Sequence, residues 1–257
     1  MRDDVVDPIV EISDVRCHFG GVRAVDGASF ALERGRITGL IGPNGAGKST
    51  VLNTVAGSLR PTGGTVRFDG VDITGRGPHE IARGGLLRTF QRSSEFGHMT
   101  VLENLVAAAP DCRGTTVLGA LRSRRWWRAD EDAAVARAHE LLERFDMGAK
   151  AHEYAGQLSG GQKRLVELMR ALMARPTVLL LDEPFAGVLP SLVRRIEQHL
   201  MDLRREGLTM MLVEHDLGTI ERLSDHVIVM ANGRVLAQGA LAELRENREV
   251  IDAYLGG

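Results

Sequence analysis

Short apolar runs alternate with helical patterns and glycine-rich turns over most of the chain. Six runs are typical of strands, at residues 9–12, 28–32, 36–41, 65–68, 177–182 and 209–213. A helical pattern follows the third run at residues 48–59, and another separates the last two runs at residues 190–205. This alternation predicts an α/β fold with a mostly parallel sheet and helices on both of its faces.

Between the two groups of strands the pattern becomes helical. Helices are expected at residues 101–109 and 130–145, with an arginine-rich segment between them. That segment contains Trp126 and Trp127, which either contact lipid headgroups or a membrane partner, or pack against the helices. Residues 241–255 are expected to form two short helices at the end of the chain.

Composition narrows the class of protein. The 257 residues are 44% hydrophobic and 26% charged, with a formal net charge of -2, which is typical of a soluble globular chain of one large or two small domains. The near balance of charge gives no reason to expect a nucleic-acid partner. Cys17 and Cys112 lie far apart without a ligand pattern, which argues against a zinc site and a disulfide framework. No apolar run approaches the ~18–20 residues that cross a bilayer.

The segment GPNGAGKS at residues 42–49 matches the phosphate-loop pattern GxxxxGK[ST] and lies between an apolar run and a helical pattern. Its glycines let successive backbone N–H groups face phosphate oxygens, and the helix that follows adds the positive end of its dipole. We expect Lys48 to reach the β- and γ-phosphates and the Ser49 hydroxyl to ligate Mg²⁺.

Two acidic residues follow the apolar run that ends at Leu181. Because ligands bind at the carboxyl ends of parallel strands, Asp182 is placed to meet the magnesium ion that Ser49 holds. Glu183 is placed to accept a proton from an attacking water. Paired acids at a strand end can also be a solvated cap before a turn, and the phosphate loop upstream is what favours the catalytic interpretation.

A second anion-binding pattern, LSGGQ, covers residues 158–162 and begins a helical pattern. One nucleotide does not need two such nests from the same chain. The simplest explanation is that the second nest closes on the nucleotide of another copy or relative, so that a head-to-tail dimer encloses ATP.

Together these segments resemble the nucleotide-binding subunits of ABC transporters, over residues 9–255. Phe19 lies where that family has an aromatic residue that stacks on adenine, although it could instead belong to the core. Gln91 matches the glutamine that senses magnesium and the attacking water. His215 matches the histidine that contacts the γ-phosphate.

The resemblance implies a P-loop NTPase fold of the RecA-like type, with an antiparallel β subdomain and an inserted helical subdomain. It implies one domain at residues 9–257, divided into an ATP-binding core (9–91 and 158–240), a helical insertion (92–157) and a tail (241–257). It implies ATP and Mg²⁺ as cofactors, with nucleotide contacts from Phe19, Gly42, Pro43, Asn44, Gly45, Ala46, Gly47, Lys48, Ser49, Thr50, Ser159, Gly160, Gly161 and Gln162. Metal ligation is expected at Ser49, Gln91 and Asp182, and catalysis at Glu183, His215 and Gln91.

Local stretches are most similar to cassettes that energise the import of branched-chain or other hydrophobic amino acids, including FGGVRAV, RTFQ, MTVLENL and EHD. A urea or amide importer, another ABC transporter and a non-transport ABC ATPase are the alternatives. The resemblance implies permease subunits, a second identical or different cassette and, indirectly, a substrate-binding protein as partners, at the cytoplasmic face of the inner membrane. Leu189 stands where the family has a polar residue, and Gly160 where these importers often have a bulky one.

Overall fold

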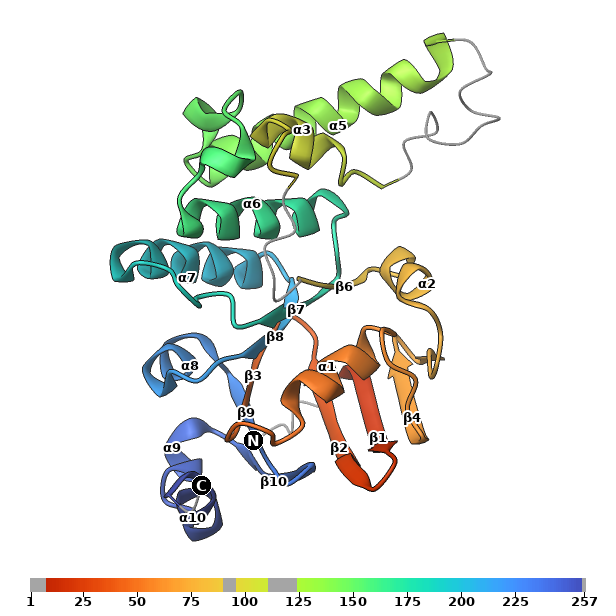
Figure 1. Ribbon diagram of the computed structural model, residues 1–257, viewed down its shortest axis with the longest axis vertical. Coiled ribbons are helices and arrows are strands. Elements are labelled where there is room, and N and C mark those ends of the chain that lie inside the picture. Colours follow the sequence, from red (N-terminus) through yellow and green to blue (C-terminus); the bar gives the residue numbers. More distant parts are fainter. Residues whose placement is uncertain (1–7, 90–95, 111–123, 256–257) are drawn as a thin grey trace, which may run out of the picture. The chain divides into compact units, whose positions relative to one another are not determined.

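The computed structural model describes residues 8–89, 96–110 and 124–255 (Figure 1). The chain forms two compact units. The first comprises residues 1–89, 176–184 and 197–257, and the second comprises residues 90–175 and 185–196.

The first unit is built on a six-stranded sheet in the order β10-β9-β3-β8-β7-β6, in which every pairing is parallel except that of the edge strand β10 with β9. Its strands are β3 (Ile37–Ile41), β6 (Leu86–Arg88), β7 (Val178–Asp182), β8 (Thr209–Val213), β9 (His226–Ala231) and β10 (Arg234–Gly239). All residues of β3, β7 and β8 are buried, which explains why these strands are uninterrupted apolar runs in the sequence.

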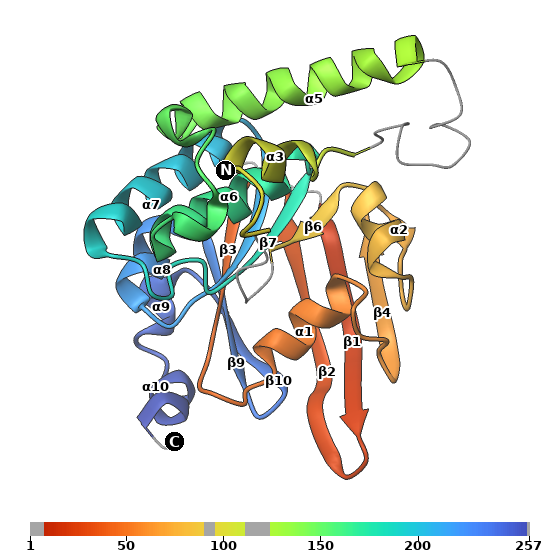
Figure 2. The same cartoon turned by 45° about the horizontal axis from the view of Figure 1, so that its top comes forward.

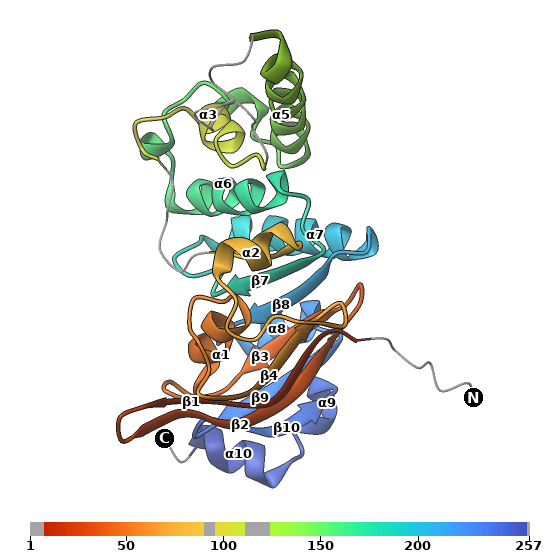
Figure 3. The same cartoon turned by 90° about the vertical axis from the view of Figure 1, so that its right-hand side faces the viewer.

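A second, antiparallel sheet in the same unit has the order β2-β1-β4-β5. Its strands are β1 (Pro8–Phe19), β2 (Val22–Glu33), β4 (Gly63–Phe68) and β5 (Val71–Asp72). Helix α1 (Lys48–Val55) packs against both sheets, through β2 on one side and β7 on the other (Figures 2 and 3). Val51, Leu52 and Val55 of this helix join the hydrophobic core that the two sheets share.

Four further short helices and part of α7 belong to this unit. They are α2 (Pro78–Arg83), α8 (Leu217–Leu223), α9 (Leu241–Leu244) and α10 (Arg248–Leu255), together with the later part of α7 (Pro190–Arg205). Helix α8 contacts β3 and is separated by three residues from the end of β8, so it begins at the carboxyl end of that strand.

The second unit is helical. It contains α3 (Val101–Val106), α5 (Arg124–Arg144), α6 (Gly160–Met173), the start of α7, and short 3-10 turns at Gly148–Lys150 and Ala155–Gln157. Helices α3, α5 and α6 pack pairwise around fully buried Leu105, Leu141, Leu142 and Met169. A capping box between Thr100 and Glu103 begins α3.

The α/β fold and the mostly parallel sheet agree with the sequence-based expectation, and three helix boundaries differ. The helix expected at residues 48–59 ends at Val55, before Gly57, whose positive φ of 74° is unfavourable inside a helix. The helix expected at residues 101–109 ends at Val106. The helix expected at residues 130–145 begins at Arg124, because residues 124–129 contain no proline or glycine that would interrupt a helix and include arginine, a good helix former. The segment with Trp126 and Trp127 is therefore helical and does not separate two helices.

Candidate functional site

The phosphate loop at residues 42–47 joins β3 to α1, in the strand-loop-helix context that its sequence requires. Two glycines fix its path. A Cβ atom at Gly42 would lie 2.1 Å from the carbonyl oxygen of Met230, and one at Gly47 would lie 2.4 Å from that of Ala24. Gly47 also has a φ of 99°, which L-amino acids with side chains rarely adopt. The predicted contacts from Gly42 to Gly47 thus lie on one tightly anchored turn, with Lys48, Ser49 and Thr50 in the first turn of α1.

Lys48 is 6% exposed, and its ammonium group donates hydrogen bonds of 2.7 Å to the Gly42 carbonyl and 2.9 Å to the Pro43 carbonyl. An ammonium group has three protons, so beyond these two acceptors among the described residues one proton remains for a phosphate oxygen. Burial lowers the pKa of Lys48 below its ordinary value, and the nearby charges of Glu183 and Asp182 oppose that shift. The two carboxylates and the lysine therefore share one electrostatic environment.

Asp182 ends β7 and is 1% exposed. The Arg88 guanidinium donates a 2.7 Å hydrogen bond to Asp182 Oδ2 and a second, short one to Asn53 Oδ1. Asp182 Oδ1 is buried and has no hydrogen-bond partner among the described residues. A buried carboxylate oxygen without a partner is costly unless a cation or a bound water satisfies it, so the chemistry of Asp182 Oδ1 fits a hard cation such as Mg²⁺.

Glu183 and His215 are brought together from the ends of β7 and β8. Glu183 Oε1 lies 2.9 Å from His215 Nε2, and the Glu183 backbone N–H donates to the Val213 carbonyl. Glu183 has a φ of 48°, a left-handed conformation that costs of order 1 kcal/mol and is concentrated at functional sites. The pair lies near the surface, where Glu183 is 29% and His215 46% exposed at the side chain.

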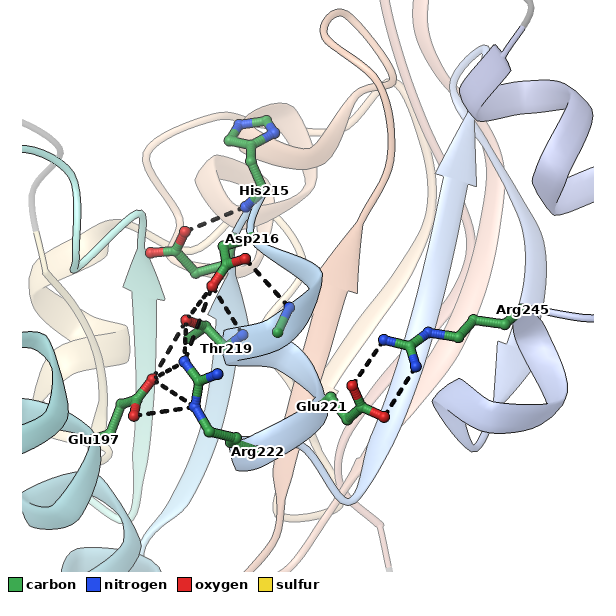
Figure 4. Close-up of polar contacts among 9 residues, drawn as sticks. Glu197, His215, Asp216, Thr219, Glu221, Arg222 and Arg245 are labelled. Carbon is green, nitrogen blue, oxygen red and sulfur yellow. Dashed lines mark hydrogen bonds and ion pairs between the residues drawn. The ribbon is translucent and has the colours of Figure 1, made fainter. Parts of the chain in front are cut away.

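The residues after β8 form a network that the sequence did not indicate (Figure 4). Asp216 caps α8, accepting from the backbone N–H groups of Gly218 and Thr219. Glu197 of α7 binds Arg222 through hydrogen bonds of 2.6 to 3.2 Å. The contacting residues are 25 positions apart, so no local pattern could have revealed them.

The LSGGQ segment lies in the second unit, where Ser159 and Gln162 form a capping box at the start of α6. The Ser159 hydroxyl accepts from the Gln162 N–H, and the Gln162 side chain accepts from the Ser159 N–H. A Cβ atom at Gly161 would lie 2.3 Å from Leu192 Cδ2, whereas one at Gly160 would meet its nearest atom, the Gly187 oxygen, at 3.8 Å. The second glycine is needed for packing, and the first has room for a side chain.

Two predicted residues have simple outcomes. Phe19 ends β1 and is 51% exposed, so it is not a core residue and the alternative of a core role was wrong. Gln91 lies outside the described residues, and its predicted metal and catalytic roles stay predictions.

The site residues invite comparison with known proteins. A family model described as "ABC transporter" matches residues 25–186, which is more than half of the chain. The chain belongs to the ABC transporter family. Residues 234–257 of this ABC protein also match a model described as "Branched-chain amino acid ATP-binding cassette transporter".

Relatives cover the ABC chain from end to end. The branched-chain amino acid transport ATP-binding protein BraF of Pseudomonas aeruginosa is 40% identical over 97% of this chain and 98% of its own. The probable branched-chain amino acid transport ATP-binding protein LivG of Methanocaldococcus jannaschii is 37% identical over 100% of both chains. This ABC protein is therefore an ATP-binding subunit like those of branched-chain amino acid importers.

Solved structures agree with the fold of this ABC protein. The ADP conformation of an ATP-binding cassette of an ABC transporter has a TM-score of 0.85 and 36% identity, covering 98% of this chain and 100% of that one. A nucleotide-free ATP-binding cassette has a TM-score of 0.84 and 35% identity, with the same coverage. Both chains are ABC cassettes with the P-loop NTPase fold. No described helix of the ABC protein is both long and apolar enough to cross a bilayer.

Proposed function

We propose that the chain hydrolyses ATP to energise a transporter that imports branched-chain or other hydrophobic amino acids. The observation that carries the proposal is the Glu183–His215 contact of 2.9 Å, at the ends of β7 and β8. Strand β8 pairs with β3, which leads into the phosphate loop. Family membership supports ATP binding, and the two ionisable side chains are those that hydrolysis needs at the γ-phosphate.

Each residue then has a separate task. The backbone N–H groups of residues 44–49 and the Lys48 ammonium bind phosphate oxygens. Glu183 accepts a proton from the attacking water, and His215 holds the Glu183 carboxylate in place and contacts the γ-phosphate. Phe19 is exposed and available to stack on adenine.

Ser49 and the free Oδ1 of Asp182 would hold Mg²⁺, with Gln91 as a further proposed ligand. When bound, Mg²⁺ neutralises charge on the β- and γ-phosphate oxygens. Arg88 fixes the other oxygen of Asp182, so the free oxygen has a defined direction.

Ser159, Gly160, Gly161 and Gln162 are proposed to bind the nucleotide of a second cassette, which is either a copy of this chain or a different one. They lie at the start of α6 with their backbone N–H groups in the first helical turn. The phosphate loop and this segment belong to different units of the chain, so head-to-tail pairing would bring one of each to every nucleotide.

The substrate and the partners rest on the relatives. Their names describe branched-chain amino acid transport, and they match this chain over its whole length. We therefore propose permease subunits as direct partners, a substrate-binding protein as an indirect one, and a peripheral location at the cytoplasmic face of the inner membrane. A urea or amide importer, another ABC transporter and a non-transport ATPase remain the alternatives to be tested.

The catalytic part is tested with Glu183→Gln. The variant should bind ATP as the wild type does but release no phosphate beyond background, because the amide cannot accept the proton of water. Glu80→Gln, at an exposed ion pair with Arg76, is the matched control and should leave turnover unchanged. Multiple turnover by Glu183→Gln would refute the assignment of the general base.

The transport part is tested by affinity purification from gently solubilised membranes of the source cells, followed by uptake into vesicles. Co-purification of membrane-spanning subunits and a second cassette, with ATP-dependent uptake of leucine that urea does not compete for, is expected. Recovery of soluble partners alone would refute the transporter assignment, and urea-competed uptake would support the amide alternative.

A further inference from the structure

The segment that carries His215 is only three residues long and is held by its two ends. Strand β8 ends at Val213 and helix α8 begins at Leu217. On the strand side the segment continues a fully buried strand. On the helix side it depends on Asp216, whose carboxylate caps α8 (Figure 4). The orientation of His215 toward Glu183 therefore depends on how firmly Asp216 is held.

The Thr219 hydroxyl lies between two carboxylates. Its oxygen is 2.6 Å from Asp216 Oδ2 and 3.3 Å from Glu197 Oε1. A hydroxyl group has one hydrogen, so it can donate to only one of them. The shorter distance identifies Asp216 as the acceptor.

Arg222 accounts for this choice. Its guanidinium donates from Nε and from one terminal nitrogen to Glu197, at 2.6 to 3.2 Å, and the same terminal nitrogen donates at 3.0 Å to the Thr219 oxygen. Glu197 is 8% exposed and has its charge balanced by Arg222, so it does not need the Thr219 hydrogen. Because Arg222 donates to the Thr219 oxygen, the hydrogen of the Thr219 hydroxyl points away from Arg222 and toward Asp216.

We propose that Arg222 is a positioning residue for ATP hydrolysis, which acts through Glu197, Thr219 and Asp216 to hold the segment that carries His215. This inference rests on the proposed catalytic role of the Glu183–His215 pair. The directions of the pKa shifts agree with it. The Thr219 hydrogen bond is the largest cause that lowers the pKa of Asp216, and the Glu197 hydrogen bond is the largest cause that raises the pKa of Arg222.

The decisive variant is Arg222→Met, assayed for ATPase activity in the full chain within its purified complex. Without Arg222 the Thr219 hydroxyl is free to donate to Glu197, and Asp216 then loses its hydrogen bond from Thr219. We expect kcat to fall by about tenfold or more, because misplacing a reacting group by about 1 Å can cost about 100-fold. We expect KM for ATP to change by less than about twofold, because the phosphate loop is untouched.

Helix α8 also offers a matched control. Glu221 forms a bidentate ion pair with Arg245, with distances of 2.9 and 2.8 Å, that joins α8 to the segment after α9. Arg245→Met removes a guanidinium group that is paired with an acid of the same helix, Glu221 of α8, but leaves Asp216 and Thr219 unchanged. It should keep kcat at the wild-type value, and an equal fall in both variants would overturn the proposal.

Loss of stability is separated from loss of positioning by two variants that are each measured for Tm and kcat. Thr219→Val keeps the Arg222–Glu197 ion pair but removes the hydrogen that is donated to Asp216, so kcat should fall as it does in Arg222→Met. Glu197→Met/Arg222→Met removes the carboxylate that competes with Asp216 for this hydrogen, so kcat should recover toward wild type. A wild-type kcat in Thr219→Val, or a double variant as slow as Arg222→Met, would overturn the positioning role. A wild-type complex without ATPase activity would instead overturn the proposed function, and with it this inference.

Discussion

Replacing Arg88 by methionine tests how the magnesium-binding aspartate is kept inside the protein. Methionine has a similar length but no charge and no hydrogen-bond donors. Asp182 is fully buried at the side chain, Arg88 is 13% exposed, and their contact is 2.7 Å. Since Asp182 Oδ1 has no partner among the described residues, the variant leaves the carboxylate without its one side-chain donor.

The size of the effect follows from the burial of both partners. Breaking a buried ion pair by removing one member costs about 3–5 kcal/mol, because the remaining charge is neither hydrated nor balanced. A domain of this size loses about 2–4 °C of Tm per kcal/mol, so we expect Tm to fall by about 6–20 °C. That is a large fraction of a total stability of about 5–15 kcal/mol.

The assay is thermal unfolding of the full chain without nucleotide or magnesium, supported by urea titration. Arg76→Met is the matched control, since its ion pair with Glu80 is 41% and 60% exposed and should contribute about 0–1 kcal/mol. The double variant Arg88→Met/Asp182→Asn removes the unbalanced charge and should recover much of the loss. If Arg88→Met cost no more than Arg76→Met, Arg88 would not be what balances the buried charge of Asp182.

Two further outcomes are expected in the helical unit. Gly161→Ala should destabilise the chain by about 1–3 kcal/mol, because the added methyl group overpacks against Leu192. Gly160→Ala should be tolerated, because a Cβ atom has room there. Equal effects of the two substitutions in urea unfolding would show that the packing argument is wrong. Hydrogen bonds from Thr100 lower the pKa of Glu103 in the folded protein. The stability that the Glu103 carboxylate adds is therefore present above its unfolded pKa and is lost as pH falls through its folded pKa. The difference in unfolding free energy between wild type and Glu103→Gln should shrink only in acid, and a difference that grew in acid would contradict this direction.

Parts of the fold could be predicted because they depend on local patterns. The sequence-based bounds of α7 and β8 match the structure, since Pro190 begins the helix and β8 is buried throughout. Strands β1 and β2 are each 12 residues long, but only short apolar pieces of them were expected. Their polar residues face away from the core. The length of β1 and β2 is determined by their pairing with each other, and this pairing cannot be seen in the sequence of one strand alone.

The candidate site divides in the same way. The phosphate loop, the acids at the end of β7 and the capping box at Ser159 each lie within a short stretch of sequence, so their patterns predict local geometry. Arg88 reaches Asn53 and Asp182 across 35 and 94 residues, and a buried arginine at a strand end gives no sign of its partners. A motif in the sequence identifies the catalytic side chain. The contacts that hold it in position come from residues far apart in the sequence, so only the fold shows them.

The loop after Glu183 carries the clearest departure from the family pattern. The carbonyl of Leu189 accepts from the N–H groups of Leu192 and Val193, which makes Leu189 the N-cap of α7, and its side chain is 73% exposed. Leucine cannot accept the hydrogen bond that an Asn or Asp side chain would, a loss of about 0.5–2 kcal/mol that Pro190 at the next position partly offsets. Because the Leu189 side chain is exposed, packing in the hydrophobic core does not explain why leucine stands at this position. In a dimer of two copies of this chain, both loops would carry leucine at position 189. A different cassette with a polar residue at the matching position would instead make the two nucleotide sites chemically unequal. The identity of the second cassette recovered by affinity purification therefore decides between a symmetric and an asymmetric dimer.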